Sequence, residues 1–236
     1  MIVSDQPTIF GNAIVAALSS NSDGNLKYGL GDDAQTLKNR EQFLGKIGID
    51  IHHTSLVGIT YDTNDFTKYR IATLTDRGSG MLAPDVEEYV DALVTTEPGH
   101  ALFLPIADCA GVILYDPVKQ VLMVSHLGRH SVEQDGAARS VEYMIEKCGV
   151  SARDILAWIS PSVGKTTYPL NAFEGQSLQE VILQQLERAG VIKEHTEVSA
   201  VDTAHDENYF SHSEFLKGYQ DTPGRFAVVA MMPRAG

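Results

Sequence analysis

Cys109 and His126 are the two residues of this 236-residue chain whose types and setting best suit chemistry. Cys109 stands between two apolar runs, and His126 follows the next apolar run and directly precedes a helix pattern. A thiolate and imidazoles can bind Zn²⁺ and leave its fourth position open for water. Alternatively, His126 can act as the base that activates Cys109 as a nucleophile. The third interpretation is structural, with Cys109 as a small buried side chain and His126 as a core histidine.

The other histidines and the second cysteine carry weaker signals. His52 and His53 open a strand pattern. Because side chains alternate along a strand, only one of the two can face a given pocket. Cys148 ends a helix pattern directly before Gly149, and its spacing implies no partner. We therefore expect Cys148 to have a packing role only.

The helix pattern after His126 offers a binding point for an anion. Ser131 and Gln134 have the spacing of a capping box at its start, with Arg129 and His130 just before it. The N-terminus of a helix presents free N–H groups and a partial positive charge. This segment therefore predicts binding of phosphate or another anion, although Ser131 would cap a purely structural helix in the same way.

Strand and helix patterns alternate along the chain and must position these residues. Runs rich in β-branched residues predict strands at Ile51–Tyr61, Lys68–Leu74, Ala101–Ile106, Gly111–Tyr115, Val121–Ser125, Ile155–Ile159, Glu197–Val201 and Arg225–Met231. Asp116-Pro117 is a turn signal and predicts a hairpin. Apolar residues at helical spacing predict helices at Ala34–Ile47, Val132–Lys147 and Leu178–Ala189. The mixture predicts a single layered α/β (α+β) domain.

Composition excludes several classes of protein. Lys and Arg number 18 against 31 Asp and Glu, a net charge of −13 that argues against a nucleic-acid partner. Two cysteines are too few for a disulfide scaffold. The longest apolar run, Phe226–Met232, is far shorter than the roughly 20 residues of a membrane span. With no basic stretch before Lys27 to suggest a signal peptide, we expect a cytoplasmic protein without a membrane partner.

Several of these residues resemble the hallmarks of the YfiH-like family, also described as multicopper polyphenol oxidase (laccase domain) or purine nucleoside phosphorylase. Its Ala-Asp-Cys and its His-Ala-Gly-Trp-Arg-Gly are similar to Ala107-Asp108-Cys109 and His126–Ser131. Its Gln-Val-His-Gly segment aligns with Ile51–Thr54. Further matches span almost the whole chain, at Gly31–Asp33, Asn39-Arg40, Asp91–Thr95, Tyr209–Ser211 and Gly224-Arg225.

The resemblance implies a fold, a metal and a class of substrate. The fold is one layered domain over residues 1–236, a mixed sheet flanked by helices, related to cysteine-histidine toxins of the cytotoxic-necrotizing-factor type. A single zinc would bind His53, Cys109 and His126, whereas one cysteine and two histidines cannot build a multicopper cluster, so we discount copper. Small-molecule partners are expected, a purine nucleoside and phosphate, in a monomer or small homo-oligomer.

The chain also departs from the family pattern, and this shapes the expected function. Arginines that the family carries after the histidine-glycine motif, near residues 18–21 and at residue 213 are replaced. We expect a divergent zinc-dependent purine nucleoside phosphorylase or adenosine deaminase acting on adenosine, inosine, guanosine or methylthioadenosine. The alternatives are a polyphenol oxidase, a Cys-His hydrolase of a cell-wall precursor, and a non-catalytic zinc- or nucleotide-binding protein. In the enzyme, Asp108 and His130 would assist Cys109 and His126, and Arg129, Ser131, Ser211 and Tyr168 would contact substrate.

Overall fold

The computed structural model describes residues 1–86 and 88–234, and its elements form four layers. One four-stranded sheet has the order β1 (Val15–Leu18), β10 (Phe226–Met231), β5 (Ala101–Ile106), β2 (Thr54–Leu56). The other has six strands in the order β3 (Tyr69–Ile71), β4 (Ala92–Thr95), β7 (Val121–Leu127), β6 (Ala110–Asp116), β8 (Leu156–Ile159), β9 (Thr196–Val198). Both sheets mix parallel and antiparallel pairs, so the expected α+β class is confirmed, with two sheets in place of one.

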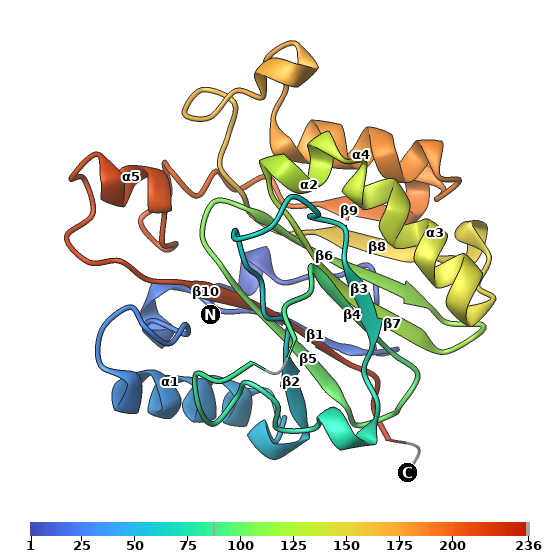
Figure 1. Cartoon of the computed structure of the whole chain (residues 1–236), viewed down its shortest axis with the longest axis horizontal. Helices are drawn as coiled ribbons and strands as arrows, with labels where there is room; N and C mark the ends of the chain where they lie inside the picture. The colour runs from blue at the N-terminus through green and yellow to red at the C-terminus, as the bar shows by residue number, and fades with distance from the viewer. Residues whose placement is uncertain (87, 235–236) are drawn as a thin grey trace.

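Alternating apolar side chains hold the layers together. Along β5, Leu102 and Leu104 enter a core shared with the second sheet, whereas Phe103 faces a core under α1 (Asp33–Lys46). The outer face of the second sheet packs against α3 (Gly136–Cys148) and α4 (Leu178–Arg188). The order from bottom to top in Figure 1 is therefore α1, first sheet, second sheet, and the pair α3 and α4. Every strand buried on both faces needs apolar residues at successive positions, as β5, β6, β7 and β10 have.

Local capping explains where the long helices begin. Asp32 accepts hydrogen bonds from two N–H groups at the start of α1, and Ser177 forms a capping box with Glu180 at the start of α4. Both helices lie within about one residue of the predicted ranges. Gly149 ends α3 in the left-handed conformation at φ 66°, which favours glycine.

The helix predicted over Val132–Lys147 is wrong in its first part. The structure divides this segment into α2 (Arg129–Glu133) and α3, and Asp135 stands between them at φ 66°. Ser131 lies inside α2 and caps nothing. Gln134 does not form the expected capping box, because its side-chain amide accepts from the Phe66 N–H and donates to the Asn64 carbonyl. Tertiary contacts of Gln134 thus outweigh a local capping pattern.

The strand predicted over Ile51–Tyr61 is also wrong for most of its length. Ile51–His53 form a short 3-10 helix because the Asp50 carboxylate accepts from the His52 N–H. Only Thr54–Leu56 form a strand, and the following residues run irregularly toward the cavity described below. The predicted hairpin is confirmed: β6 and β7 pair antiparallel around residues 117–120, with His126 opposite Gly111.

The remaining short elements were not predicted. They are the five-residue α5 (His212–Leu216) and the 3-10 turns Val3–Asp5, Asn21–Asp23, Leu74–Asp76, Ala152–Asp154, Asn171–Phe173 and Lys193–His195. Strands β1 and β4 were not predicted either, because their four-residue sequences Val-Ala-Ala-Leu and Ala-Leu-Val-Thr are too short to show a clear strand pattern.

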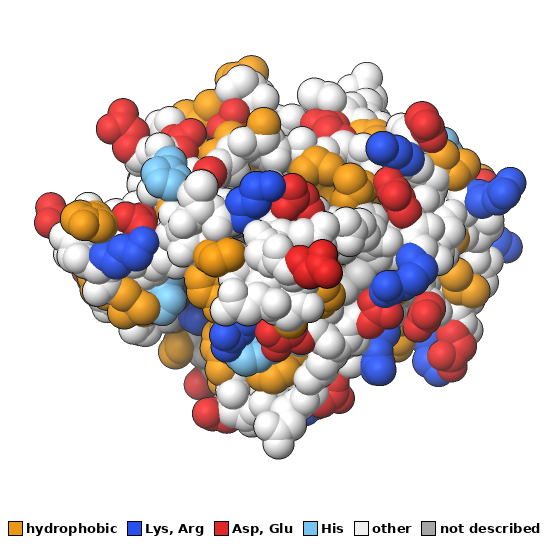
Figure 2. Space-filling view, turned by 90° about the horizontal axis from the view of Figure 1, so that it is seen from above, with side chains coloured by type: hydrophobic (Ala, Val, Ile, Leu, Met, Phe, Trp, Pro, Cys, Tyr) orange, Lys and Arg blue, Asp and Glu red, His pale blue; other side chains and the backbone are white. Residues whose placement is uncertain are grey.

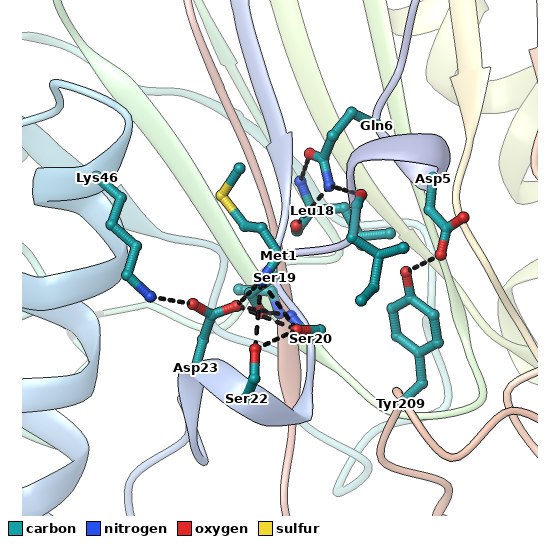
Figure 3. Close-up of polar contacts among 12 residues, drawn as sticks. Met1, Asp5, Gln6, Leu18, Ser19, Ser20, Ser22, Asp23, Lys46 and Tyr209 are labelled. Carbon is teal, nitrogen blue, oxygen red and sulfur yellow. Dashed lines mark hydrogen bonds and ion pairs between the residues drawn. The ribbon is translucent and has the colours of Figure 1, made fainter.

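A polar network ties the N-terminal segment to the body of the protein (Figure 3). The buried Asp23 carboxylate binds the Met1 amino group at 2.7 Å and the Lys46 ammonium at 2.7 Å. The Tyr209 hydroxyl donates to the Asp5 carboxylate at 2.6 Å. The two ion pairs of Asp23 compensate its buried charge, which would be costly without partners.

The helices and the surface charges bear on the membrane and nucleic-acid partners considered from the sequence. Within residues 1–86 and 88–234, none of the helices combines the length and apolar composition needed to cross a bilayer. On the face drawn in Figure 2, acidic and basic side chains are interspersed rather than gathered into a continuous basic surface.

Candidate active site

A cavity of about 360 Å³ opens beside the last residues of β5 and β7. Its lining brings together most of the predicted site residues, namely Cys109, His126, Asp108, Arg129, His130 and Ser131. Tyr168 also lines it. His53 and Ser211 do not belong to this lining. The volume suits a small molecule, since ligand pockets commonly measure about 300–1,000 Å³.

Asp108 fixes the turn that carries Cys109. It lies between β5 and β6 at φ 71°, a left-handed conformation that is strained for a residue other than glycine. Its carboxylate accepts from the Thr203 hydroxyl at 2.9 Å and the Ser213 N–H at 2.6 Å, and its carbonyl accepts from the Val163 N–H at 2.9 Å. With both carboxylate oxygens engaged, Asp108 positions Cys109 rather than acting as a free base.

Cys109 and His126 approach each other around Gly128. A Cβ atom at Gly128 would lie 3.0 Å from the Cys109 Sγ and 3.4 Å from Cε1 of the His126 ring. Burial disfavours charge on His126, but the Cys109 thiolate and the Asp91 carboxylate raise the pKa of His126 to about 9. Burial raises the pKa of the Cys109 thiol, but His126 and the Tyr61 hydroxyl lower it below its ordinary value. Each residue of the pair thus stabilises the charged form of the other, a thiolate on Cys109 and an imidazolium on His126.

Tyr61 completes this cluster from the irregular segment after β2. Its hydroxyl lies 3.8 Å from the Cys109 Sγ, and its ring meets the His126 ring edge-on, with centroids 6.4 Å apart at 86°. The Cys109 thiolate and burial raise the pKa of Tyr61, so the phenol stays protonated. Sequence reasoning missed Tyr61, which it placed at the end of the strand predicted over Ile51–Tyr61 and gave no role in the site.

The structure does not bring His53 to Cys109. His53 follows Asp50 on the 3-10 turn before β2, and its Nδ1 lies 3.5 Å from the Asp50 carboxylate and 3.3 Å from the Arg234 guanidinium. Thr54, the next residue, pairs with Ala101 at the start of β5, whereas Cys109 follows the end of β5. At roughly 3.3 Å per residue, β5 alone separates the two by about 16 Å. His52, which is exposed on the same 3-10 turn, cannot replace His53 beside Cys109.

The residues present do not fit the single zinc expected from the resemblance. A catalytic zinc site uses three protein ligands. Among residues 1–86 and 88–234, no three His, Cys, Asp or Glu side chains gather where they could hold a metal ion. Both ring nitrogens of His126 are buried and lack a hydrogen-bond partner within those residues, so His126 and Cys109 could offer two ligands. The hydroxyl of Tyr61, 3.8 Å from the Cys109 Sγ, belongs to a protonated phenol, which is a poor metal ligand.

The remaining predicted residues have different roles. His130 stacks on the Phe66 ring with centroids 4.7 Å apart, and it faces Glu133 at 3.7 Å. Arg129 lies 3.9 Å from the Glu133 carboxylate, so it is partly neutralised. Ser131 is buried, with no partner for its hydroxyl among the described residues. Ser211 caps α5 through a hydrogen bond from the Glu214 N–H.

The two cysteines differ as expected in their surroundings. Burial raises the pKa of the Cys148 thiol, and no charged group opposes that effect. Cys148 packs at the edge of the core beneath α3 and α4. Its thiol therefore lacks the neighbours that lower the pKa of Cys109.

Two basic residues of the cavity were not predicted as site residues. Lys27 and Arg225 both line it, Lys27 from the loop before α1 and Arg225 from the residue before β10. Arg225 belongs to the Gly-Arg match at the end of the chain, which was the available signal. No sequence pattern marked Lys27.

Comparisons with known proteins relate the chain to one protein family. Residues 16–180 match the family model described as "Multi-copper polyphenol oxidoreductase laccase". "Purine nucleoside phosphorylase YlmD" of Bacillus subtilis is 30% identical over 145 residues, which cover 59% of this chain and 49% of that protein. "Purine nucleoside phosphorylase" of Bacteroides thetaiotaomicron is 26% identical over 175 residues, covering 73% and 63%. The chain thus matches about half to two thirds of the length of these relatives.

Solved structures share the fold over nearly the whole chain. YlmD from Geobacillus stearothermophilus superposes with a TM-score of 0.86 at 19% identity, covering 99% of this chain and 98% of that one. The Bacillus licheniformis hypothetical protein YfiH superposes with a TM-score of 0.84 at 22% identity, covering 94% and 93%. Together with the family model, which spans more than half of the chain, these findings show that the chain belongs to the multi-copper polyphenol oxidoreductase laccase family, with the YfiH/YlmD fold.

Proposed function

We propose that the chain is a purine nucleoside phosphorylase, which splits the bond between a purine base and ribose with inorganic phosphate in the Cys109–His126 cavity. The observation that carries the proposal is the juxtaposition, in one cavity, of an imidazolium, aromatic rings and basic side chains. The names of the relatives support the same reaction.

The aromatic side of the cavity suits a purine. Phe66 stacks with His130 at 4.7 Å and lies 6.4 Å from the Tyr61 ring. Flat aromatic faces bind a nucleobase by stacking, at roughly 1–3 kcal/mol per base. A base held there lies within the same cavity as the His126 ring.

His126 supplies the proton that the reaction needs. As a phosphate oxygen bonds to C1′ of the ribose, the bond from C1′ to the purine nitrogen breaks, and its electron pair stays on the base. Donation of a proton from the His126 imidazolium makes that base a neutral leaving group. The neighbouring Cys109 thiolate keeps the imidazolium protonated before the base arrives. Because the donor set for zinc is incomplete, no step of this proposal uses a metal.

A second candidate function is hydrolysis by a Cys109 nucleophile. The observation favouring it is the approach of Cys109 and His126, which lowers the pKa of the thiol, with no group of three metal-ligating side chains among residues 1–86 and 88–234. In that reaction the substrate group that is transferred to Cys109 passes finally to water, and not to phosphate.

The test is a nucleoside panel with and without phosphate. Adenosine, inosine and guanosine are incubated with the protein, and the free base and ribose 1-phosphate are quantified by chromatography. Phosphate-dependent release of both products is expected, with loss of turnover in His126→Ala and unchanged turnover in Cys148→Ala. Release of base without a phosphate requirement supports hydrolysis instead. Conversion of adenosine to inosine indicates a deaminase, and no turnover on any nucleoside contradicts the proposal.

A further inference from the structure

Two cations in the cavity have no acidic partner in the described part of the chain. Neither the Lys27 ammonium nor the Arg225 guanidinium has an ion pair with any carboxylate in residues 1–86 and 88–234. Within the described residues, the Arg225 guanidinium donates one hydrogen bond, to the carbonyl of its own neighbour Gly224 at 2.7 Å. Both side chains are half-buried and line the cavity beside Cys109.

Partial burial of two neighbouring cations is costly, and a bound anion would offset that cost. Burial and the nearby Arg225 charge lower the pKa of Lys27. Burial likewise lowers the pKa of Arg225, and the negative charge of Cys109 opposes this effect at both residues. Removing a cation from water costs free energy that an opposing charge must restore. Asp108 lies in the same lining, but both of its carboxylate oxygens are already used by Thr203 and Ser213.

Asn25 holds the two cations together although they are about 200 residues apart in the sequence. Its Oδ1 accepts hydrogen bonds from the Lys27 N–H at 3.1 Å and the Arg225 N–H at 3.0 Å. Its Nδ2 donates to the Lys27 carbonyl at 2.7 Å. The Leu26 N–H donates to the Arg225 carbonyl at 3.0 Å, which locks the same two segments together. Such double anchoring preorganises the pair of charges.

The helix start predicted to bind the anion is less suitable. Helix α2 has only five residues, and Arg129 at its start faces Glu133. Ser131 is buried within the helix and is not its cap.

We propose that Lys27 and Arg225, positioned by Asn25, form the site that binds a phosphate oxyanion next to Cys109 and His126. The role of this anion as the second substrate rests on the proposed function, but its binding does not. Arg225 can present parallel N–H groups to two phosphate oxygens, and Lys27 adds a point charge. An anion there lies in the same cavity as the aromatic rings proposed to hold the base.

The experiment measures binding of inorganic phosphate by titration calorimetry, without a nucleoside. Lys27→Ala and Arg225→Ala are each expected to raise the Kd for phosphate at least about tenfold, because each removes a charge-assisted contact. Lys27→Arg keeps the charge and is expected to stay within about threefold of the wild type. Lys147→Ala removes an equal charge on the exposed end of α3 and is the matched control. Thermal unfolding confirms that each variant is folded.

Further measurements identify which anion binds and test the positioning role of Asn25. A nucleoside monophosphate that binds more tightly than inorganic phosphate identifies a ligand phosphoryl group as the occupant, and equal or weaker binding identifies the free ion. Asn25→Ala is expected to weaken phosphate binding with Lys27 and Arg225 intact.

The proposal is overturned if Lys27→Ala and Arg225→Ala bind phosphate as tightly as the wild type. It is also overturned if they change only the alkylation rate of Cys109, because the two cations then serve the thiolate. If only Arg129→Ala loses phosphate binding, the anion site lies at α2 and not at Lys27 and Arg225. Phosphate binding that depends on Lys27 and Arg225 but without nucleoside turnover would refute the proposed function and leave this site standing.

Discussion

Replacing Gly128 by alanine tests whether the Cys109–His126 geometry carries the chemistry. Gly128 has φ −104° and ψ −176°, an extended conformation that any residue adopts, so the change introduces no backbone strain. The added Cβ would lie 3.0 Å from the Cys109 Sγ, 3.4 Å from His126 Cε1 and 3.6 Å from His126 Nε2. Non-bonded carbon atoms prefer about 3.5–4.0 Å. The sulfur must therefore move by roughly 0.5 Å or more.

The expected cost falls on activity and not on stability. A misplacement of about 1 Å in a reacting group can lower a rate by about 100-fold. A shift of about half that size predicts a loss of about 10- to 100-fold in kcat/KM for nucleoside cleavage. The alanine also restricts the unfolded chain, which contributes roughly 0.4–1 kcal/mol of stability and offsets the crowding. The free energy of unfolding is therefore expected to change by less than about 1 kcal/mol.

The assay combines cleavage kinetics, Cys109 alkylation by iodoacetamide and chemical denaturation. Gly45→Ala is the matched control, since a Cβ at Gly45 within α1 would meet nothing within 4 Å. We expect Gly45→Ala to keep full activity and to gain about 0.5–1 kcal/mol of stability. Wild-type cleavage and alkylation rates in Gly128→Ala would refute the assignment of the Cys109–His126 pair as the reacting centre.

Three further predictions follow from the same contacts. At pH 6.5 to 7, iodoacetamide should modify Cys109 faster than Cys148, because the pKa is lowered at Cys109 and raised at Cys148; equal rates measured by peptide mass spectrometry would contradict this. Purified wild-type protein should hold well under one zinc per chain by elemental analysis, and Tyr61→His should hold more; stoichiometric wild-type zinc would show that a third ligand exists. Asp23→Asn should cost about 1–3 kcal/mol at pH 7, measured by urea denaturation. Burial opposes charge on Asp23, but Lys46 and the Met1 amino group outweigh this effect and lower the pKa of Asp23. The stability that Asp23 contributes is therefore present above pH 3.8 and is lost as the pH falls through the lowered pKa of the folded state. An unchanged acid transition in Asp23→Asn would contradict this prediction.

The sequence by itself determined the parts of the fold that depend on local signals. Strand β5 was predicted with its observed bounds, and the hairpin of β6 and β7 followed from continuous apolar runs around a turn signal. Helices α1 and α4 begin at the caps that Asp32 and Ser177 provide. The pairing of Cys109 with His126 could also be expected, because each lies at the end of a predicted strand.

Local signals failed where a long-range contact outweighed them. Ser131 and Gln134 have the spacing of a capping box, but the Gln134 amide binds the backbone of residues 64 and 66 instead. The segment before β2 has the composition of a strand, yet the Asp50 side chain turns it into a 3-10 helix. In both cases a side chain bonds to the backbone in a way that a periodicity argument does not include.

Only the tertiary structure decided which residues accompany Cys109 and His126. His53 was expected beside them, but the pairing of Thr54 with Ala101 holds it at the opposite end of β5. Tyr61 reaches Cys109 instead, through an irregular segment that has no periodicity to read. Lys27 and Arg225 come together because the Asn25 side chain accepts from both of their N–H groups across about 200 residues. Such contacts depend on register and on loop paths, which are set by the packing of the whole chain and not by the sequence around each residue.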